Sequence, residues 1–269
     1  MVTLPLILCY HKVERRRELG VTRLSPRRFA RQIERLALAG FRALSLEELL
    51  ASVHGERAAS ERELTITFDD AYRGLREHAF PVLEAHGFPS ICAVITSYAG
   101  RLNRWDVAYG GRRFAHLAWR DMRHWQARGV TFIPHTLTHP RLTWCDADTA
   151  RHELLQSRLD LERALDCRSP AISYPFGAAR ARELALAADA GFVAGFTLAT
   201  RWRGDPLAIP RLPVYAWSPP TPGTGPLSAL EWVAAAASNR CAVGTTAWRR
   251  LRGAAGDVRQ NIARPLAAE

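Results

Sequence analysis

Two short segments of this 269-residue chain combine residue types that bind metals and transfer protons. The first, TITFDD, ends in the adjacent carboxylates Asp69 and Asp70, and the second, VTFIPHTLTHP, holds His135 and His139 four residues apart. One carboxylate and two imidazoles can hold a divalent cation with coordination positions left open, which is typical of a catalytic metal site rather than a structural one. The second carboxylate is then available to accept a proton.

Each segment also has a purely structural explanation. An aspartate between a strand and a helix commonly caps that helix, and a pair of loop histidines can simply be hydrogen-bonded. Pro140 prevents a long helix after the histidines, so we expect them in a loop that contains a turn. Taken one at a time, the two motifs leave the choice between a structural and a catalytic role open.

Two further segments place polar or aromatic groups after predicted strands. His11 ends the first strand, and strand alternation turns it to the same face as Cys9. A lone histidine there is usually a satisfied polar residue, but no histidine follows His152, so His11 is the best-placed proton donor. The segment SYPFG at 173–177 is either an ordinary turn or a loop that offers a backbone N–H and aromatic rings to a sugar.

The elements that would position these residues follow from the hydrophobic pattern. Short runs rich in Ile, Val, Phe, Thr and Tyr alternate with amphipathic segments, which favours a parallel α/β sheet or barrel with its chemistry at the C-terminal ends of the strands. Ser25 is expected to cap a helix that begins at Pro26 and stops at Gly40. We expect strands at 4–10, 64–68, 90–96, 130–133, 171–174, 192–197 and 208–214, and further helices at 71–86, 119–128, 147–165 and 179–190.

Composition narrows the class of protein. An apolar fraction of 48% fits a globular chain and excludes a disordered one. The net charge of +11 permits attraction to anionic lipid, nucleic acid or acidic sugars, but no nucleic-acid-binding motif accompanies it. Five widely spaced cysteines without a Cys-x-x-Cys pair indicate neither a disulfide framework nor a zinc–thiolate site. With no secretory signal recognised at the N-terminus, we expect a cytoplasmic location.

The domain organisation is expected to have three parts. Residues 1–218 form the α/β unit, 219–226 are a Pro/Gly-rich linker, and 227–269 are a basic, Ala/Arg-rich helical tail. The tail is a docking helix or a frayed end, or else a peripheral contact with the anionic inner face of a membrane.

In combination, the motifs resemble those of the polysaccharide deacetylases, the carbohydrate esterases that share the NodB-homology domain. The resemblance extends from about residue 6 to 214 and rests on Tyr10-His11, TFDD at 67–70, HTLTH at 135–139 and YPFG at 174–177. It implies a distorted (β/α) barrel of about seven parallel strands. It also implies metal-dependent hydrolysis of an N-acetyl group on an amino sugar, within a glycan, a glycolipid precursor or a small glycoside.

The resemblance also implies a role for each residue of the site. Asp70, His135 and His139 would bind one divalent metal, Zn²⁺ first, with Co²⁺, Ni²⁺ or Mn²⁺ as alternatives. Asp69 would be the general base. The chain is most similar to a branch with rotated motif order, in which the histidine of an N-terminal Tyr-His, here His11 as imidazolium, donates a proton to the leaving amine.

Two departures from the family pattern are visible. Ala71 stands where a glycine usually follows the carboxylate pair, and Ser173 stands where many members carry the arginine that orients the base. Arg211, at the end of the last predicted strand, is our candidate to replace that arginine. The expected contacts with the sugar are made by the aromatic residues Tyr10, Tyr174 and Phe176.

Two rival functions remain open at this point. A two-histidine, one-carboxylate set also serves non-haem iron oxygenases, although those usually use antiparallel double-sheet scaffolds. A catalytically inactive, glycan-binding barrel is the non-enzymatic alternative. The sequence determines neither the sugar, nor its linkage, nor the oligomeric state.

Overall fold

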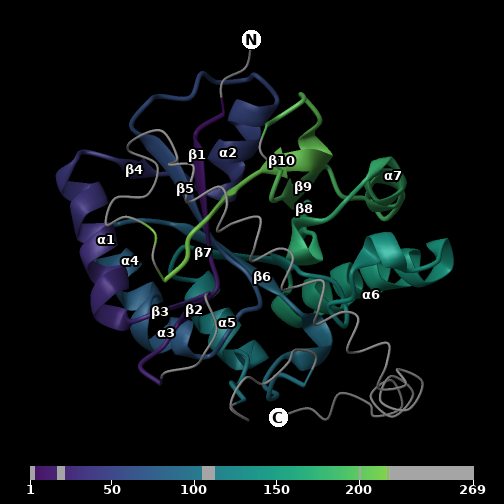
Figure 1. Cartoon of the computed structure of the whole chain (residues 1–269), viewed down its shortest axis with the longest axis horizontal. Helices are drawn as coiled ribbons and strands as arrows, with labels where there is room; N and C mark the ends of the chain where they lie inside the picture. The colour runs from purple at the N-terminus through teal and green to yellow at the C-terminus, as the bar shows by residue number, and fades with distance from the viewer. Residues whose placement is uncertain (1–3, 17–21, 105–112, 200, 217, 219–269) are drawn as a thin grey trace.

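The computed structural model describes residues 4–16, 22–104, 113–199, 201–216 and 218. Its main sheet has six parallel strands in the order β11-β1-β5-β6-β7, with β4 paired to the beginning of β5 (Figure 1). The strands are β1 (Leu6–Tyr10), β4 (Arg42–Ala43), β5 (Glu63–Phe68), β6 (Ser90–Val94), β7 (Val130–Pro134) and β11 (Leu212–Pro213). Because these strands are parallel, the C-terminal ends of β11, β1, β5, β6 and β7 lie at the same edge of the sheet.

A second parallel sheet has the order β10-β9-β8 and lies beside the first (Figure 1). Its strands are β8 (Ala171–Ser173), β9 (Ala194–Thr197) and β10 (Ile209–Pro210). The chain passes between the sheets at Arg211, which separates β10 from β11. On the other side, a hydrogen bond of 2.8 Å from His135 Nδ1 to the Ser173 carbonyl links the end of β7 to the end of β8.

The predicted α/β fold with parallel strands is confirmed, but no closed barrel forms among the described residues. The single strand expected at 208–214 is divided into β10 and β11. Pro210 and Pro213 have no backbone N–H, so a continuous hydrogen-bonded ladder cannot run through this segment. A short additional pair, β2 (Lys12–Val13) and β3 (Arg23–Leu24), lies outside both sheets.

Most helices begin and end close to the predicted positions. Ser25 caps α1 with Pro26 in the first turn, and α6 covers the predicted range. The helix expected at 71–86 is divided into α3 and α4 beside Pro81, and α2 was not expected although Ser45 and Glu48 form its capping box. The helices are α1 (Pro26–Leu38), α2 (Leu46–Val53), α3 (Gly74–His78), α4 (Phe80–Ala85), α5 (Trp119–Gln126), α6 (Ala147–Leu165) and α7 (Ala181–Asp189).

Strand β1 separates two parts of the core. Leu8 and Tyr10 face α1 and join a cluster that includes Phe29 and Phe68, whereas Ile7 faces the second sheet. Because side chains alternate along a strand, residues 9 and 11 follow residue 7 and face the space between the sheets. Because of this alternation, His11 of the Tyr10-His11 motif can reach the site and Tyr10 cannot.

No helix in the described part of the chain is both long and apolar enough to cross a bilayer. The predicted linker at 219–226 and the predicted basic tail at 227–269 lie outside the described residues.

Candidate metal centre and its neighbouring carboxylate

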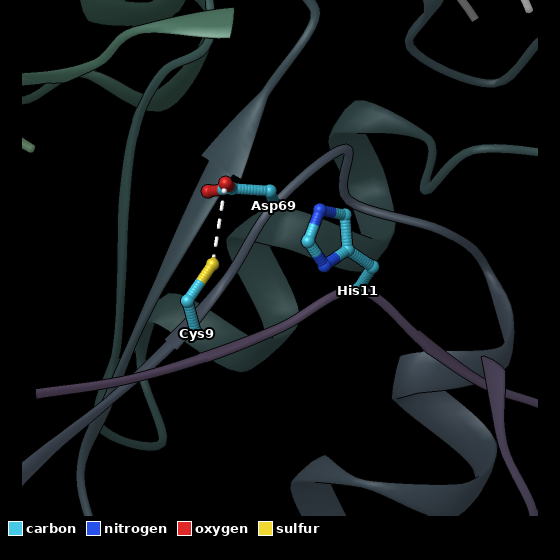
Figure 2. A group of neighbouring side chains, drawn as sticks. All are labelled: Cys9, His11 and Asp69. Atoms are coloured by element: carbon cyan, nitrogen blue, oxygen red, sulfur yellow. Dashed lines mark hydrogen bonds between the residues drawn. The ribbon is translucent and has the colours of Figure 1, made fainter. Parts of the chain in front are cut away.

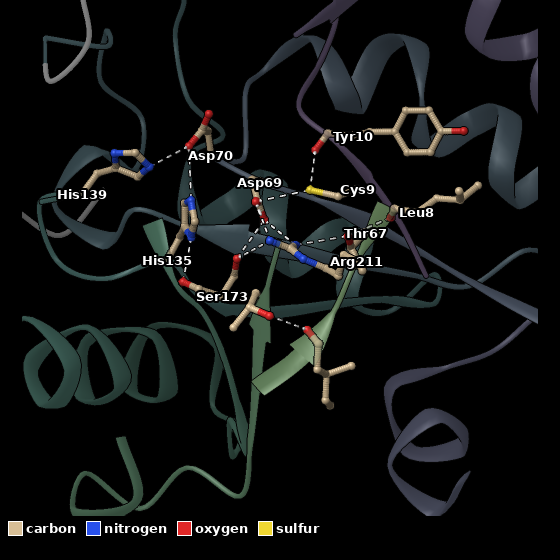
Figure 3. Close-up of polar contacts among 12 residues, drawn as sticks. Leu8, Cys9, Tyr10, Thr67, Asp69, Asp70, His135, His139, Ser173 and Arg211 are labelled. Carbon is tan, nitrogen blue, oxygen red and sulfur yellow. Dashed lines mark hydrogen bonds and ion pairs between the residues drawn. The ribbon is translucent and has the colours of Figure 1, made fainter. Parts of the chain in front are cut away.

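Three potential metal ligands converge at the C-terminal edge of the main sheet. Asp70 follows β5, His135 follows β7, and His139 lies four residues farther along (Figure 3). Asp70 Oδ1 is 3.6 Å from Nε2 of His135 and 3.5 Å from Nε2 of His139. All three side chains are buried, and their nearest donor atoms lie within 4.8 Å of one another.

The donor set fits a divalent cation. Ligand atoms about 2.1 Å from a tetrahedral metal lie roughly 3.4 Å apart, close to the separations found between the carboxylate and each imidazole. The His135 Nδ1–H donates to the Ser173 carbonyl, which leaves the Nε2 lone pair directed at Asp70. Burial also lowers the pKa of His135, which favours the neutral imidazole that metals bind.

The loops of the site have an unusual backbone. Among the described residues, six that are not glycine have a positive φ, and five of them belong to these loops. This left-handed conformation costs an L-residue about 1–2 kcal/mol. A glycine would adopt this conformation without that cost at the position of Ala71, where φ is 50°. The five residues are Asp70, Ala71, Thr136, His139 and Phe176.

The strained turn after β5 is held by a segment that the sequence analysis missed. The ring of His116 is hydrogen-bonded through Nδ1 to the Asp70 carbonyl, and the Leu117 N–H donates to the Ala71 carbonyl at 2.8 Å. The His116 ring also stacks on Tyr72, with centroids 4.9 Å apart. No local pattern marked His116, because it follows no strand and meets the turn only through tertiary contact.

The second carboxylate, Asp69, has a different set of partners from Asp70 (Figure 3). Arg211 donates to both of its oxygens at 2.8 Å, and the Ser173 hydroxyl donates at 3.0 Å. Arg211 is itself buried and also contacts Thr67 at 3.2 Å. The structure thus brings Arg211 to Asp69 from 142 residues away, and Ser173 is a further partner of both.

The guanidinium controls the charge of this carboxylate. Burial alone would raise the pKa of Asp69, but the charge and hydrogen bonds of Arg211 hold that pKa well below its usual range. Asp69 is therefore a carboxylate throughout the physiological range and a weak base. Its orientation is fixed by the two-pronged contact with Arg211.

His11 lies beside Asp69 at the end of β1, with Cys9 below (Figure 2). Donor atoms of these three residues lie within 4.8 Å of one another, and the Cys9 thiol is 3.4 Å from Asp69 Oδ2. Burial, opposed by Asp69 and aided by Arg211, lowers the pKa of His11 to about 4. This lowered pKa favours the neutral imidazole of His11 in the metal-free protein. The buried Nδ1 of His11 has no hydrogen-bond partner among the described residues.

The three aromatic residues expected to contact a sugar lie in different places. The Tyr10 ring points away from the carboxylates and packs in the core on Phe29 and Phe68, with centroids 5.3 and 5.6 Å away (Figure 3). Tyr174 is also fully buried. Only the ring of Phe176 is partly exposed and adjacent to the site, 4.8 Å from the ring of His139. The side chains of Tyr10 and Tyr174 are therefore not placed to contact a substrate, contrary to our expectation.

The lowered pKa values of two histidines predict a pH-dependent stability of the metal-free protein. Burial lowers the pKa of both His11 and His116 to about 4, against about 6.5 in an unfolded chain. The unfolded state therefore binds protons at pH 5 that the folded state does not, and stability that is present above pH 6.5 is lost as the pH falls toward 4. Each histidine should lower the free energy of unfolding by about 2 kcal/mol between pH 7 and pH 5.

Urea unfolding at these two pH values measures the effect. The variant His11→Gln should remove about half of the loss that the two rings cause together. His152→Gln, which changes an exposed histidine on α6, should keep all of it. An equal free energy of unfolding at pH 7 and pH 5 in the unmodified protein would contradict the assignment of both rings as neutral.

Comparison with known proteins agrees with this geometry. A family model described as polysaccharide deacetylase matches residues 56–195, which is just over half of the chain. The chain belongs to the polysaccharide deacetylase family. The matched region includes Asp69, Asp70 and both histidines of the metal centre, while His11 and Arg211 lie outside it.

Individual relatives are distant. The chain is 24% identical over 191 residues to YxkH of Bacillus subtilis (strain 168), which carries a provisional name as a polysaccharide deacetylase. The match covers 71% of this chain and 63% of that protein, so the chain spans less than two thirds of the curated relative's length. Assignment to the family therefore rests on the family model rather than on this relative.

Solved structures share the fold at low identity. The Streptococcus pyogenes deacetylase PplD, solved in complex with acetate, aligns with a TM-score of 0.71 at 22% identity, over 82% of this chain and 96% of that one. IcaB from Ammonifex degensii aligns with a TM-score of 0.69 at 22% identity, over 87% of this chain and 97% of that one. These similarities support the same arrangement of parallel strands.

Proposed function

We propose that this protein hydrolyses the N-acetyl group of an amino sugar with the help of one divalent cation. The observation that carries the proposal is the pairing of two adjacent acids with opposite surroundings. Asp70 faces two imidazoles, whereas Asp69 is bound by a guanidinium at 2.8 Å. One acid is therefore placed to bind a cation and the other to accept a proton.

The ligands of the cation would be Asp70, His135 and His139. When bound, a cation such as Zn²⁺ polarises an amide carbonyl and lowers the pKa of a water molecule. The donor set of two nitrogens and one oxygen suits Zn²⁺ and also accepts Co²⁺, Ni²⁺ or Mn²⁺. Zinc as the native metal is part of the proposal.

Asp69 would accept the proton of the attacking water. Its low pKa makes it a weak base, so it can act only on a water that has become more acidic than bulk water. Arg211 and Ser173 hold both oxygens in place, which keeps the carboxylate oriented for the transfer. Arg211 is in this account a positioning residue.

His11 would carry the proton onward to the leaving amine. Its pKa of about 4 lies above that of Asp69, so a proton accepted by Asp69 is more stable on His11. The two side chains are close enough for transfer directly or through one water. This relay explains how a histidine that is neutral at rest can still supply a proton. The expulsion of an amine requires that proton, because an unprotonated amine is a poor leaving group.

The test combines metal analysis with acetate release. Purified protein is expected to hold about one equivalent of divalent metal. It should release acetate from at least one member of a panel of N-acetylated sugars. Chelation should abolish that release and added Zn²⁺ or Co²⁺ should restore it.

The same experiment separates the rival functions. Acetate release at an undiminished rate after complete removal of metal would overturn the proposal. Iron-dependent oxygen consumption without acetate release would instead support the oxygenase. Sugar binding with neither metal nor hydrolysis would support an inactive barrel.

Several finer points stay predictions from the sequence. They include the backbone N–H of Phe176 as a donor to the tetrahedral oxyanion, a cytoplasmic location, and peripheral contact of the tail with an anionic membrane. The choice between a polymer, a lipid-linked glycan and a small glycoside belongs with them.

A further inference from the structure

Beside the metal centre lies a guanidinium that contacts two aromatic rings. Arg141 follows His139 by two residues and is partly buried. Its guanidinium carbon is 5.5 Å from the centre of the Trp144 ring and 5.8 Å from that of Phe176. Stacking on aromatic faces orients the plane of a guanidinium and leaves its N–H groups available for a planar anion.

Arg141 has no carboxylate partner in the described part of the chain. By contrast, Arg151, Arg158 and Arg182 each form an ion pair with a carboxylate. Its buried Nε has no hydrogen-bond partner there either. Arg180 carries a second positive charge and follows Phe176 by four residues in the chain. Arg180 likewise forms no ion pair with the described residues. Partial burial of a guanidinium without a counter-ion is unfavourable, and an anion bound to Arg141 would offset that cost.

The position of this pair relates it to the reaction. Phe176 is the common neighbour: its ring is 4.8 Å from the ring of His139 and also contacts Arg141. The guanidinium therefore lies one aromatic ring beyond a metal ligand. A sugar whose N-acetyl group reaches the cation site can place another substituent, or its neighbouring unit, against Arg141.

We propose that Arg141 binds an anionic group of the substrate, a carboxylate or a phosphate, so that the enzyme selects acidic N-acetylated amino sugars over neutral ones. This inference rests on the proposed function, and it adds the class of substrate. Arg182 in the first turn of α7 is excluded from the role because it is engaged with Glu183 and with the carbonyl of Leu142.

The first test measures selectivity. Acetate release is followed with N-acetylglucosamine 1-phosphate, N-acetylmuramic acid and the neutral methyl glycoside of N-acetylglucosamine. The unmodified protein should prefer at least one acidic sugar, and the one preferred tells phosphate from carboxylate. Arg141→Gln should lower the ratio of kcat/KM between that acidic sugar and the neutral one by at least about tenfold, since a charge-assisted pair is lost.

Three further variants are compared with Arg141→Gln. Arg180→Gln should lower the ratio less, because its side chain is exposed. Arg141→Lys keeps the charge but not the planar fork, and should fall between the unmodified protein and Arg141→Gln. The matched control Arg151→Gln removes an exposed arginine on α6 and should leave the ratio unchanged. A preference for the neutral sugar, or an unchanged ratio in Arg141→Gln, would overturn the proposal.

A binding measurement keeps this test independent of catalysis. Calorimetry with glucosamine 1-phosphate, muramic acid and glucosamine requires no turnover. Acidic amino sugars should bind more tightly than glucosamine, and Arg141→Gln should weaken the preferred one at least about tenfold. Equal binding by Arg141→Gln and the unmodified protein overturns the anion site. Absence of acetate release from every sugar, with anion binding intact, overturns only the proposed function.

Discussion

Replacing Arg211 by methionine should lower the free energy of unfolding by about 3–5 kcal/mol, because the substitution leaves a buried carboxylate without its counter-ion. Asp69 and Arg211 are both buried and joined by two hydrogen bonds of 2.8 Å. Methionine fills a similar volume, so the loss should come from the unpaired charge rather than from a cavity. Chemical denaturation at pH 7 measures it.

A double substitution distinguishes this cause from general damage to the core. Asp69→Asn combined with Arg211→Met removes both charges and should recover most of the lost stability, because neither partner is then left buried and ionised. The double variant should still be inactive. If it is no more stable than Arg211→Met alone, the stability loss arises from packing, and the charge pair is not what holds this region together.

Asp69→Asn should lower kcat/KM for acetate release by about 100- to 10,000-fold while the metal content stays near one equivalent. Asparagine has nearly the shape of aspartate but cannot accept a proton at neutral pH. Asp70 and the two imidazoles are untouched, since the substituted side chain forms its contacts with Arg211, Ser173 and Cys9 instead. The comparison of turnover with metal content therefore separates the base from the ligands.

Two controls complete this experiment. Asp148→Asn changes a fully exposed acid at the start of α6 and should retain normal turnover. Asp70→Asn should reduce both turnover and bound metal, in contrast to Asp69→Asn. Near-normal acetate release by Asp69→Asn, with its metal intact, would show that another group accepts the proton and would remove Asp69 from the mechanism.

Local signals in the sequence were sufficient for most of the elements. The caps at Ser25 and Pro26, the apolar periodicity of 147–165 and the short β-branched runs each act within a few residues, so they could be recognised without a structure. The placement of Asp70 and His135 at one edge also followed, because parallel strands end on the same side. The capping box of α2 carried a signal of the same kind that was overlooked.

Tertiary structure decided which side chains meet and in what charge state. Tyr10 and His11 are neighbours in sequence, yet alternation along β1 and the packing of α1 put one ring in the core and the other beside Asp69. No local feature of the sequence predicted the contact of His116 with the turn at Asp70.

The sequence by itself therefore determined the kinds of element and the chemistry available at one edge of the sheet. The sequence offered Arg211 as a candidate, but only the folded chain showed that it binds Asp69 across 142 residues and that burial favours the neutral imidazole of His11. The reason is physical: propensity and periodicity act between near neighbours in the chain. Burial and charge pairing depend on which distant segments pack together, and these set the pKa values on which the proposed reaction depends.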